Sequence, residues 1–322
     1  MRNRTISGQR GNEVTTTIKI GVILVLCNLG FSVVQAAEKT EVCECEEAKT
    51  GREVKNGAAG VEPIALGSQV QTTPFSLSTH KPNYLLPISY NRNPNDLGVD
   101  LGDKSINHVE VQFQFSLKLL LTDRTAGQPH LYVAYTNRSF WQAYNNDLSS
   151  PFRDTNHEPE IFYRLPLNIA FGDWVQNSLD FGFVHQSNGR SLPLSRSWNR
   201  VYLNWTTTLD DWTFSFKPWY RLPERSKKDA DDPRGDDNPD IGDYMGHFEW
   251  LTEYRVEKHI LTAMVRNNLS SDNRGAIDLT WSYPLSNNVS WYAKWFYGYG
   301  ETLLDYNHLN NTFGLGFAIS NW

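Results

Sequence analysis

Apolar and polar side chains alternate along most of this 322-residue chain. Successive side chains of a β-strand point to opposite faces, so a period of two predicts strands with one apolar and one polar face. The run from Val109 to Leu119 has apolar residues at every odd position, with Glu110, Gln112, Gln114, Ser116 and Lys118 between them. Nothing has the pattern of a long amphipathic helix, so the chain is predicted to be all-β.

About twelve strand-like segments follow this alternation. They lie near residues 75–91, 108–121, 130–144, 158–171, 176–187, 196–208, 211–222, 243–256, 258–269, 274–284, 288–300 and 311–320. The longest polar insertion, residues 223–243, lacks the spacing of acidic residues and the terminal glutamate of a calcium-binding loop. A solvated loop outside the sheet is therefore the preferred interpretation of this insertion.

Two architectures fit this pattern, a soluble sandwich and a closed transmembrane barrel. The segments are long and apparently even in number, and their polar faces carry charged residues that suit a wet interior better than a dry core. Aromatic residues also gather near the segment ends, as interfacial girdles require: Trp141, Trp205, Trp219, Trp250, Tyr283 and Tyr297. These features favour a twelve-stranded antiparallel transmembrane β-barrel.

The chain ends in an alternating segment whose last residue, Trp322, is aromatic. A terminal strand of this kind resembles the assembly signal of bacterial outer-membrane barrels. Trp322 departs from that signal, because it is out of register with Phe313, Leu315 and Phe317.

The first 36 residues have the pattern of an export signal. A basic leader precedes a mostly apolar run, Ile20 to Val34, and small residues at Ala36 and Ala37 offer a cleavage site. A single membrane-anchoring helix is the alternative, which Asn28 and the short apolar run disfavour. We predict a signal peptide at 1–36.

A polar lead-in at 37–74 is predicted to precede the barrel, which spans 75–322. The lead-in is rich in Glu, Lys and Gly, the composition of a poorly ordered linker. Its Cys43 and Cys45 are too close in sequence for an ordinary structural disulfide, and a linker is preferred to a metal site there. The net charge of −6 gives no reason to expect nucleic acid as a partner.

Three polar residues on apolar strand faces form a candidate catalytic group. His185 and Ser187 are two positions apart, so they share the face that carries Leu179, Phe181 and Phe183. Asn199 shares a face of the next segment with Val201, Leu203 and Trp205, and neighbouring antiparallel strands could bring it beside His185. A serine nucleophile needs a base, and the base needs a third group to hold its tautomer. The alternative is three unrelated strand residues.

The residues around this group resemble the signature of the outer membrane phospholipase A family. The runs His185 to Ser191 and Ser195 to Arg200 carry most of the resemblance. Further matches lie at 149–156 with 158–159, at 217–220, at 237–241 with 244–246, and at 298–301 with 305–307. The similarity spans roughly residues 75–322.

The resemblance implies an outer-membrane enzyme that hydrolyses sn-1 and sn-2 acyl esters of phospholipids, and lysophospholipids too. It implies Ser187 as the nucleophile, His185 as the general base and then acid, and Asn199 as the group that orients the imidazole. It also implies that the backbone N–H of Gly189 contributes to the oxyanion hole.

The resemblance further implies a Ca²⁺ ion and a homodimer. The matching calcium positions are the Arg190 carbonyl, the Ser195 hydroxyl and Ser149 of the partner subunit, so activity would depend on dimerisation. Leu192 stands where family members can have an acidic residue. Leucine cannot bind a metal, so only the calcium site shared between subunits carries over.

Two other functions fit a barrel of this kind. One is a non-enzymatic outer-membrane barrel, either a porin or a structural protein. The other is an outer-membrane protease of the omptin type, which uses Asp, His and water and has no role for Ser187. Loss of lipid release in a Ser187→Ala variant would distinguish the phospholipase from the non-enzymatic barrel.

Overall fold

The computed structural model describes residues 74–97, 104–122, 127–229, 232 and 234–319, all within one compact unit that begins at Gly57. The predicted signal peptide at 1–36, nearly all of the lead-in with Cys43 and Cys45, and Trp322 lie outside the described residues. In the described ranges no helix is long and apolar enough to cross a membrane.

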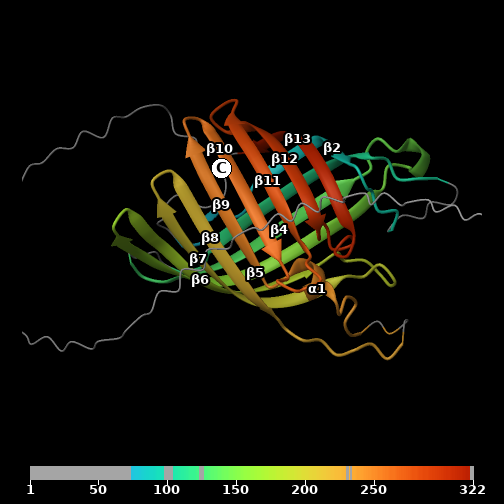
Figure 1. The fold of residues 1–322 in the computed structure, drawn as a ribbon, viewed down its shortest axis with the longest axis horizontal. Helices are drawn as coiled ribbons and strands as arrows, with labels where there is room; N and C mark the ends of the chain where they lie inside the picture. The colour runs from blue at the N-terminus through green and yellow to red at the C-terminus, as the bar shows by residue number, and fades with distance from the viewer. Residues whose placement is uncertain (1–73, 98–103, 123–126, 230–231, 233, 320–322) are drawn as a thin grey trace, which may run out of the picture. The chain divides into compact units, whose positions relative to one another are not determined.

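The regular secondary structure of the described chain is almost entirely antiparallel sheet (Figure 1). Its strands are β1 (Leu77–Thr79), β2 (Asn83–Asn91), β3 (Val109–Leu120), β4 (His130–Trp141), β5 (Phe152–Phe171), β6 (Trp174–Ser187), β7 (Ser197–Leu209), β8 (Trp212–Arg221), β9 (Phe248–Val256), β10 (His259–Asn267), β11 (Gly275–Pro284), β12 (Val289–Tyr299) and β13 (Leu309–Ile319). A short 3-10 helix, η1 (Asn146–Leu148), and one helix, α1 (Ile241–Met245), interrupt the loops.

The sheet closes into a barrel of twelve strand positions. Each strand from β2 to β13 pairs with its neighbour in sequence, and β13 pairs with β2 to close the ring. The short β1 pairs with Leu117–Leu119 of β3, while β2 pairs with the earlier part of β3. β1 and β2 are thus two pieces of one wall strand, and the predicted twelve-stranded antiparallel barrel is confirmed.

The apolar face of the sheet points outward. Phe115 is 39% exposed, whereas its inward neighbour Ser116 is 0% exposed. The same holds around the ring: Tyr135, Phe181, Leu203, Trp250 and Phe313 are all exposed. Such a continuous apolar exterior is unstable in water and stable against lipid, so this wall is the membrane-facing surface.

Several charged groups inside the barrel form ion pairs, as the polar inward faces predict. The Arg153 guanidinium contacts Glu110 at 2.9 Å and Asp305 at 2.5 Å, and all three side chains are almost fully buried. Lys294 of β12 contacts Glu301, just beyond the end of the same strand, at 2.8 Å. A buried charge is costly unless it is paired, and the Arg153 bridges tie β3, β5 and the loop after β12 together.

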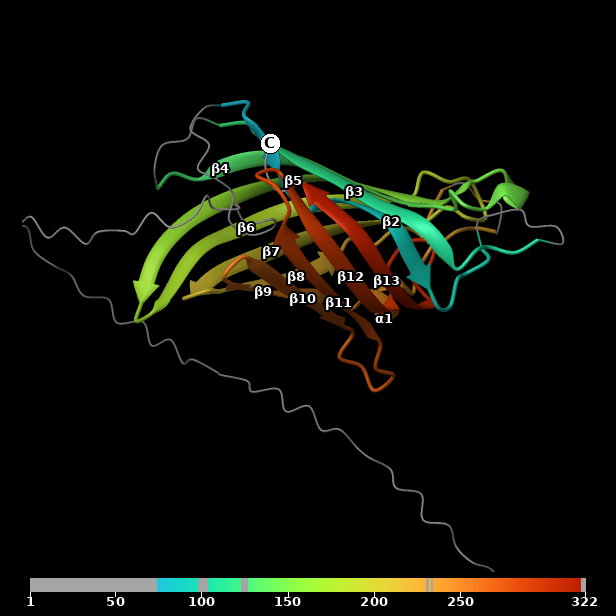
Figure 2. The same cartoon turned by 90° about the horizontal axis from the view of Figure 1, so that it is seen from above.

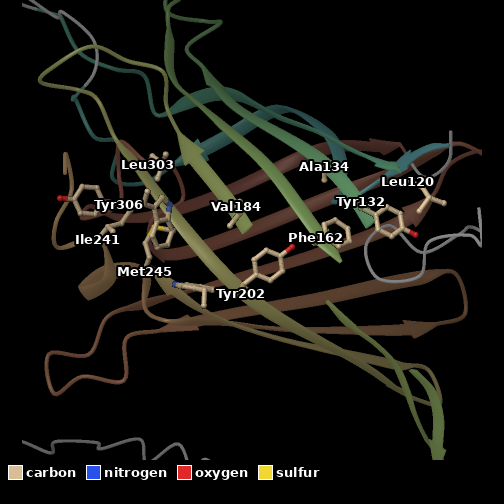
Figure 3. Packing of buried hydrophobic residues seen from close by; sticks show 12 residues of the cluster. Leu120, Tyr132, Ala134, Phe162, Val184, Tyr202, Ile241, Met245, Leu303 and Tyr306 are labelled. Atoms are coloured by element: carbon tan, nitrogen blue, oxygen red, sulfur yellow. The ribbon is translucent and has the colours of Figure 1, made fainter. Parts of the chain in front are cut away.

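The interior also holds an apolar cluster, shown in Figure 3. Tyr132, Phe162, Val184 and Tyr202 belong to it and come from four successive strands, β4 to β7. Trp219 also belongs to this cluster and is only 8% exposed. The prediction of Trp219 as a girdle residue was therefore wrong: its neighbours Pro218 and Tyr220 share the outward face of β8, and Trp219 alternates inward.

Long loops gather at one end of the barrel and short turns at the other (Figure 2). β7 and β8 are joined by residues 210–211 and β9 and β10 by residues 257–258, whereas β8 and β9 are separated by residues 222–247. Outer-membrane barrels have short periplasmic turns and long extracellular loops. Ser187, the last residue of β6, therefore lies toward the extracellular side.

The insertion after β8 is not simply a solvated loop. It contains α1, where a strand was predicted to begin at residue 243, and β9 starts later, at Phe248. Ile241 and Met245 are buried in the same apolar cluster as Leu303 and Tyr306 (Figure 3). Two apolar residues four positions apart lie on one face of a helix, so this short segment closes over the apolar cluster.

Candidate active site

β6 and β7 bring the predicted catalytic residues together. In this antiparallel pair His185 lies directly opposite Asn199, and Ser187 lies opposite Ser197. The next outward pairs down the wall are Phe183 with Val201 and Phe181 with Leu203. Phe181 is 59% and Leu203 46% exposed, so the polar group lies at the extracellular end of an apolar, lipid-facing stripe.

The imidazole of His185 is held by the Asn199 side chain. His185 Nδ1 lies 2.9 Å from Asn199 Oδ1. An amide oxygen can only accept a hydrogen bond, so Nδ1 carries the proton and donates it. In the neutral ring this leaves Nε2 free to accept a proton, which is the tautomer required of a general base.

Ser187 follows on the same face, two residues beyond His185 on β6. Both side chains are half-buried. Within the part of the chain that the structure describes, no side chain is hydrogen-bonded to the Ser187 hydroxyl. The bond between a nucleophile and its base is often long without substrate and tightens in the reacting complex, so this geometry is compatible with catalysis.

The loop after β6 takes its shape from Asn188, a residue of the matching run to which the sequence analysis assigned no role. The buried Asn188 side chain accepts hydrogen bonds from the backbone N–H groups of Arg190 and Arg196, and donates one to the Leu194 carbonyl. Gly189 sits in this loop with φ of 62°, a conformation that favours glycine. The nearest atoms to an added Cβ would be 3.7 Å away, so the glycine is required by backbone conformation and not by space.

Two of the three expected calcium ligands lie in this same loop. The Ser195 hydroxyl donates a hydrogen bond of 2.5 Å to Asp237, a carboxylate that sequence reasoning missed. Asp237 also contacts Lys227 at 2.5 Å. The Arg190 side chain donates to the carbonyl oxygens of Phe152 and Arg153 at 3.0 and 2.7 Å, which fixes its end of the loop.

Ser149, the third expected ligand, lies in the separate loop between β4 and β5. It is exposed, with φ of 58°, and ends η1. Hydroxyl and carbonyl oxygens are the hard donors that Ca²⁺ takes, so the chemistry of the three residues fits the ion. Among the described residues no cluster of three or more His, Cys, Asp or Glu side chains could hold a metal. The three expected ligands are a backbone carbonyl and two serine hydroxyls, so that finding does not bear on them.

Glu224 is a further neighbour of the site that sequence reasoning missed. The Asn199 Nδ2 group donates to Glu224 Oε1 at 3.2 Å. Glu224 lies in the long insertion, 25 residues away in sequence, and no local pattern indicates the contact. The pKa of Glu224 is raised, mainly by burial and then by the nearby Asp236.

His157 is a second histidine, and it lies beside Ser187. It lies on β5 directly opposite Ser187, and its Nδ1 is 2.7 Å from the Tyr135 hydroxyl. Its ring also lines the space next to Gly189. The sequence analysis assigned no role to His157, and only the register of β5 against β6 reveals that it borders the site.

A family model described as Phospholipase A1 matches residues 62–319. The phospholipase A1 of Proteus vulgaris is 36% identical over 260 residues, which cover 80% of this chain and 86% of that protein. The phospholipase A1 of Escherichia coli K12 is 35% identical over 260 residues, with the same coverage.

Solved structures of the same kind are also similar. Outer membrane phospholipase A from Escherichia coli has a TM-score of 0.70 and 34% identity, covering 78% of this chain and 94% of that one. An active-site mutant of that protein, with asparagine replaced by alanine, has the same TM-score and 33% identity, with the same coverage. A Salmonella typhi outer membrane phospholipase dimer with bound calcium has a TM-score of 0.69 and 34% identity, covering 77% and 94% of the two chains.

Proposed function

The chain belongs to the phospholipase A1 family and is an outer-membrane β-barrel; from this we propose that Ser187, His185 and Asn199 form its catalytic triad. The proposed enzyme is a calcium-dependent serine hydrolase that cleaves sn-1 and sn-2 acyl esters of phospholipids and lysophospholipids. The observation that carries the proposal is the 2.9 Å contact between His185 Nδ1 and Asn199 Oδ1 on the lipid-facing wall.

The proposed reaction is a two-step acyl transfer. Ser187 Oγ attacks the ester carbonyl while His185 Nε2 takes its proton, and the imidazolium then protonates the departing glycerol oxygen. Water, deprotonated by the same imidazole, attacks the acyl-enzyme and releases the fatty acid, and the proton returns to Ser187. The Gly189 N–H would stabilise the oxyanion in both steps.

The apolar wall below the site explains how a lipid would reach it. Phe181, Phe183 and Leu203 are exposed on the same face as His185 and Ser187. An acyl chain can therefore remain in hydrocarbon against this wall while its ester reaches the triad. Such a site contacts the ester and the chain more than the head group, so we expect loose selectivity for head groups.

We infer that Ca²⁺ binds between two subunits, at the Arg190 carbonyl and Ser195 hydroxyl of one and Ser149 of the partner subunit. When bound, the cation would add positive charge near the developing oxyanion. The oxygen donors of the β6–β7 loop support this, and so does the calcium-bound dimer of the similar Salmonella typhi protein. Exposure of Ser149 on the β4–β5 loop leaves it available to a second subunit.

Fatty-acid release from purified protein in detergent tests the proposal. The substrate is phosphatidylethanolamine with different acyl chains at its two positions, so that sn-1 and sn-2 cleavage are read separately. We expect both acids to be released with Ca²⁺ and neither with a chelator, and we expect Ser187→Ala to lose at least about 1000-fold in kcat.

Ser286→Ala is the matched control, because Ser286 is exposed in a turn at the opposite end of the barrel. It should retain wild-type activity and calcium dependence. Equal, calcium-insensitive release by wild type, Ser187→Ala and Ser286→Ala would instead favour a non-enzymatic barrel.

A further inference from the structure

The side-chain amide of Asn199 is bonded at both of its ends. Its Oδ1 faces His185 Nδ1 at 2.9 Å, and its Nδ2 donates to Glu224 Oε1 at 3.2 Å. An ionised carboxylate has no proton to give, so it can bond only to the NH₂ end of the amide. Glu224 therefore determines which way the amide points, and the oxygen is left to face the imidazole.

The orientation of this amide matters because the two possible orientations have opposite effects. With Oδ1 toward His185, Nδ1 must carry the proton and Nε2 is the free base. With Nδ2 toward His185, the ring would accept at Nδ1 and carry its proton on Nε2, where it could not deprotonate a serine. An amide with no partner at its NH₂ end could adopt either orientation.

We propose that Glu224 is a positioning residue of the active site, which acts through Asn199 to hold His185 in the tautomer that can deprotonate Ser187. This inference rests on the proposed function, because it assigns a fourth member to the Ser-His-Asn group. It also places a negative charge one amide beyond the imidazole, where it would favour the imidazolium formed during each acyl-transfer step.

The backbone places Glu224 where this role requires it. Leu222 N–H donates to the Asn199 carbonyl at 2.8 Å, which extends the β7–β8 pairing past the end of β8 and fixes the chain two residues before Glu224. Arg221 is bonded to both oxygens of Asp236 at 2.6 and 2.7 Å. This pair holds the insertion against the strand end, so the contact to Asn199 does not depend on an unsupported loop.

Burial and the neighbouring charged groups together raise the pKa of Glu224. Its pKa is raised first by burial and then by Asp236; Asn199 and Arg221 oppose the rise, and Asp237 adds to it. A protonated Glu224 has lost its charge and gained an O–H that can bond to the amide oxygen. We therefore expect kcat to fall as the pH drops through this pKa, and Glu224→Gln to lack that component of the profile.

Kinetics of three variants test the inference. Glu224→Ala should lower kcat about 10-fold and change KM less than about 2-fold, because it removes an orienting hydrogen bond and not a substrate contact. Glu224→Gln should lie between wild type and Glu224→Ala, since its amide oxygen can still accept from Nδ2 but carries no charge. Asp243→Asn, an exposed acidic residue of the same insertion, is the charge-matched control and should match wild type.

A double-mutant cycle separates positioning from simple structural support. If Glu224 acts through Asn199, Glu224→Ala should have no further effect on kcat in an Asn199→Ala background. The rate at which a sulfonyl fluoride labels Ser187 gives the same comparison where turnover is too slow to measure. Wild-type kcat in Glu224→Ala, or full additivity with Asn199→Ala, would overturn the inference. Loss of activity in Ser187→Ala alongside either result would leave the proposed function standing.

Discussion

Asparagine at position 199 suits its place on the barrel wall. A charged side chain on the lipid face of a barrel costs more free energy the deeper it lies, whereas an amide can accept a hydrogen bond from the imidazole without introducing a charge. The carboxylate of Glu224, 3.2 Å from the Asn199 amide, lies in the extracellular insertion. The amide therefore links the imidazole to a negative charge that stays outside the hydrocarbon.

Substitutions of Asn199 should separate orientation from charge. Asn199→Ala removes the acceptor for His185 Nδ1. We expect kcat to fall about 10- to 100-fold with the barrel still folded. This loss is smaller than the one caused by replacing the aspartate of a charged triad. Asn199→Asp keeps an acceptor and should retain more activity than Asn199→Ala. Steady-state kinetics on a soluble ester checks this order. Equal activity of Asn199→Ala and wild type would show that Asn199 does not orient the base.

At the residue level the sequence predicted what lies within one strand or one motif. The alternation along each strand places His185, Ser187 and Asn199 on apolar faces, and the structure brings His185 and Asn199 together as expected. Glu224, Asp237 and His157 were missed because each reaches the site through loop folding or cross-strand register. Alternation assigns a residue to a face but says nothing about which distant segment covers it.

At the level of strands, the alternation of side chains predicted the strands reliably, but it did not predict where each strand begins and ends. The twelve positions of the barrel were predicted, but the first strand is divided into β1 and β2 around residues 80–82. Pro82 lies in this break and has no N–H to donate to a neighbouring strand. The five-residue α1 was missed, because so short a helix shows barely one turn of periodicity.

Gly182 on β6 shows how closely the strands and their interior side chains fit. A Cβ at this position would lie 2.4 Å from the Tyr202 ring on β7, and the Tyr202 hydroxyl donates to the buried Glu160. Gly182→Ala should displace the ring and destabilise the barrel by about 1 to 3 kcal/mol. Samples are heated to a series of temperatures and run on SDS gels, and the temperature at which the folded band disappears measures this effect.

Gly242→Ala is the matched control for Gly182→Ala. Gly242 lies in α1, where an added Cβ would make only an ordinary contact of 3.5 Å with His247. Alanine favours a helix, so this variant should unfold at the wild-type temperature or slightly above it. A Gly182→Ala barrel as stable as the control would show that Tyr202 can move without loss.

At the level of the whole molecule, a closed barrel limits where a second subunit can act. The ring of strands leaves no open edge in the described wall from β2 to β13, so a partner can only approach the outer surface. The proposed triad lies on that surface, and Ser149 is exposed on the extracellular β4–β5 loop. The proposed calcium site would then make dimerisation in the membrane the step that completes each active site.

Mixing two inactive variants tests the shared site directly. Ser187→Ala removes the proposed nucleophile and Ser149→Ala removes the calcium ligand proposed to serve the partner, so each homodimer should be inactive with Ca²⁺. A mixed dimer, however, combines Ser187 of one chain with Ser149 of the other and restores one site. Random pairing makes half of all dimers mixed, so we expect about a quarter of wild-type fatty-acid release. If Ser149 served its own chain, or neither chain, the mixture would show no gain over its separate components.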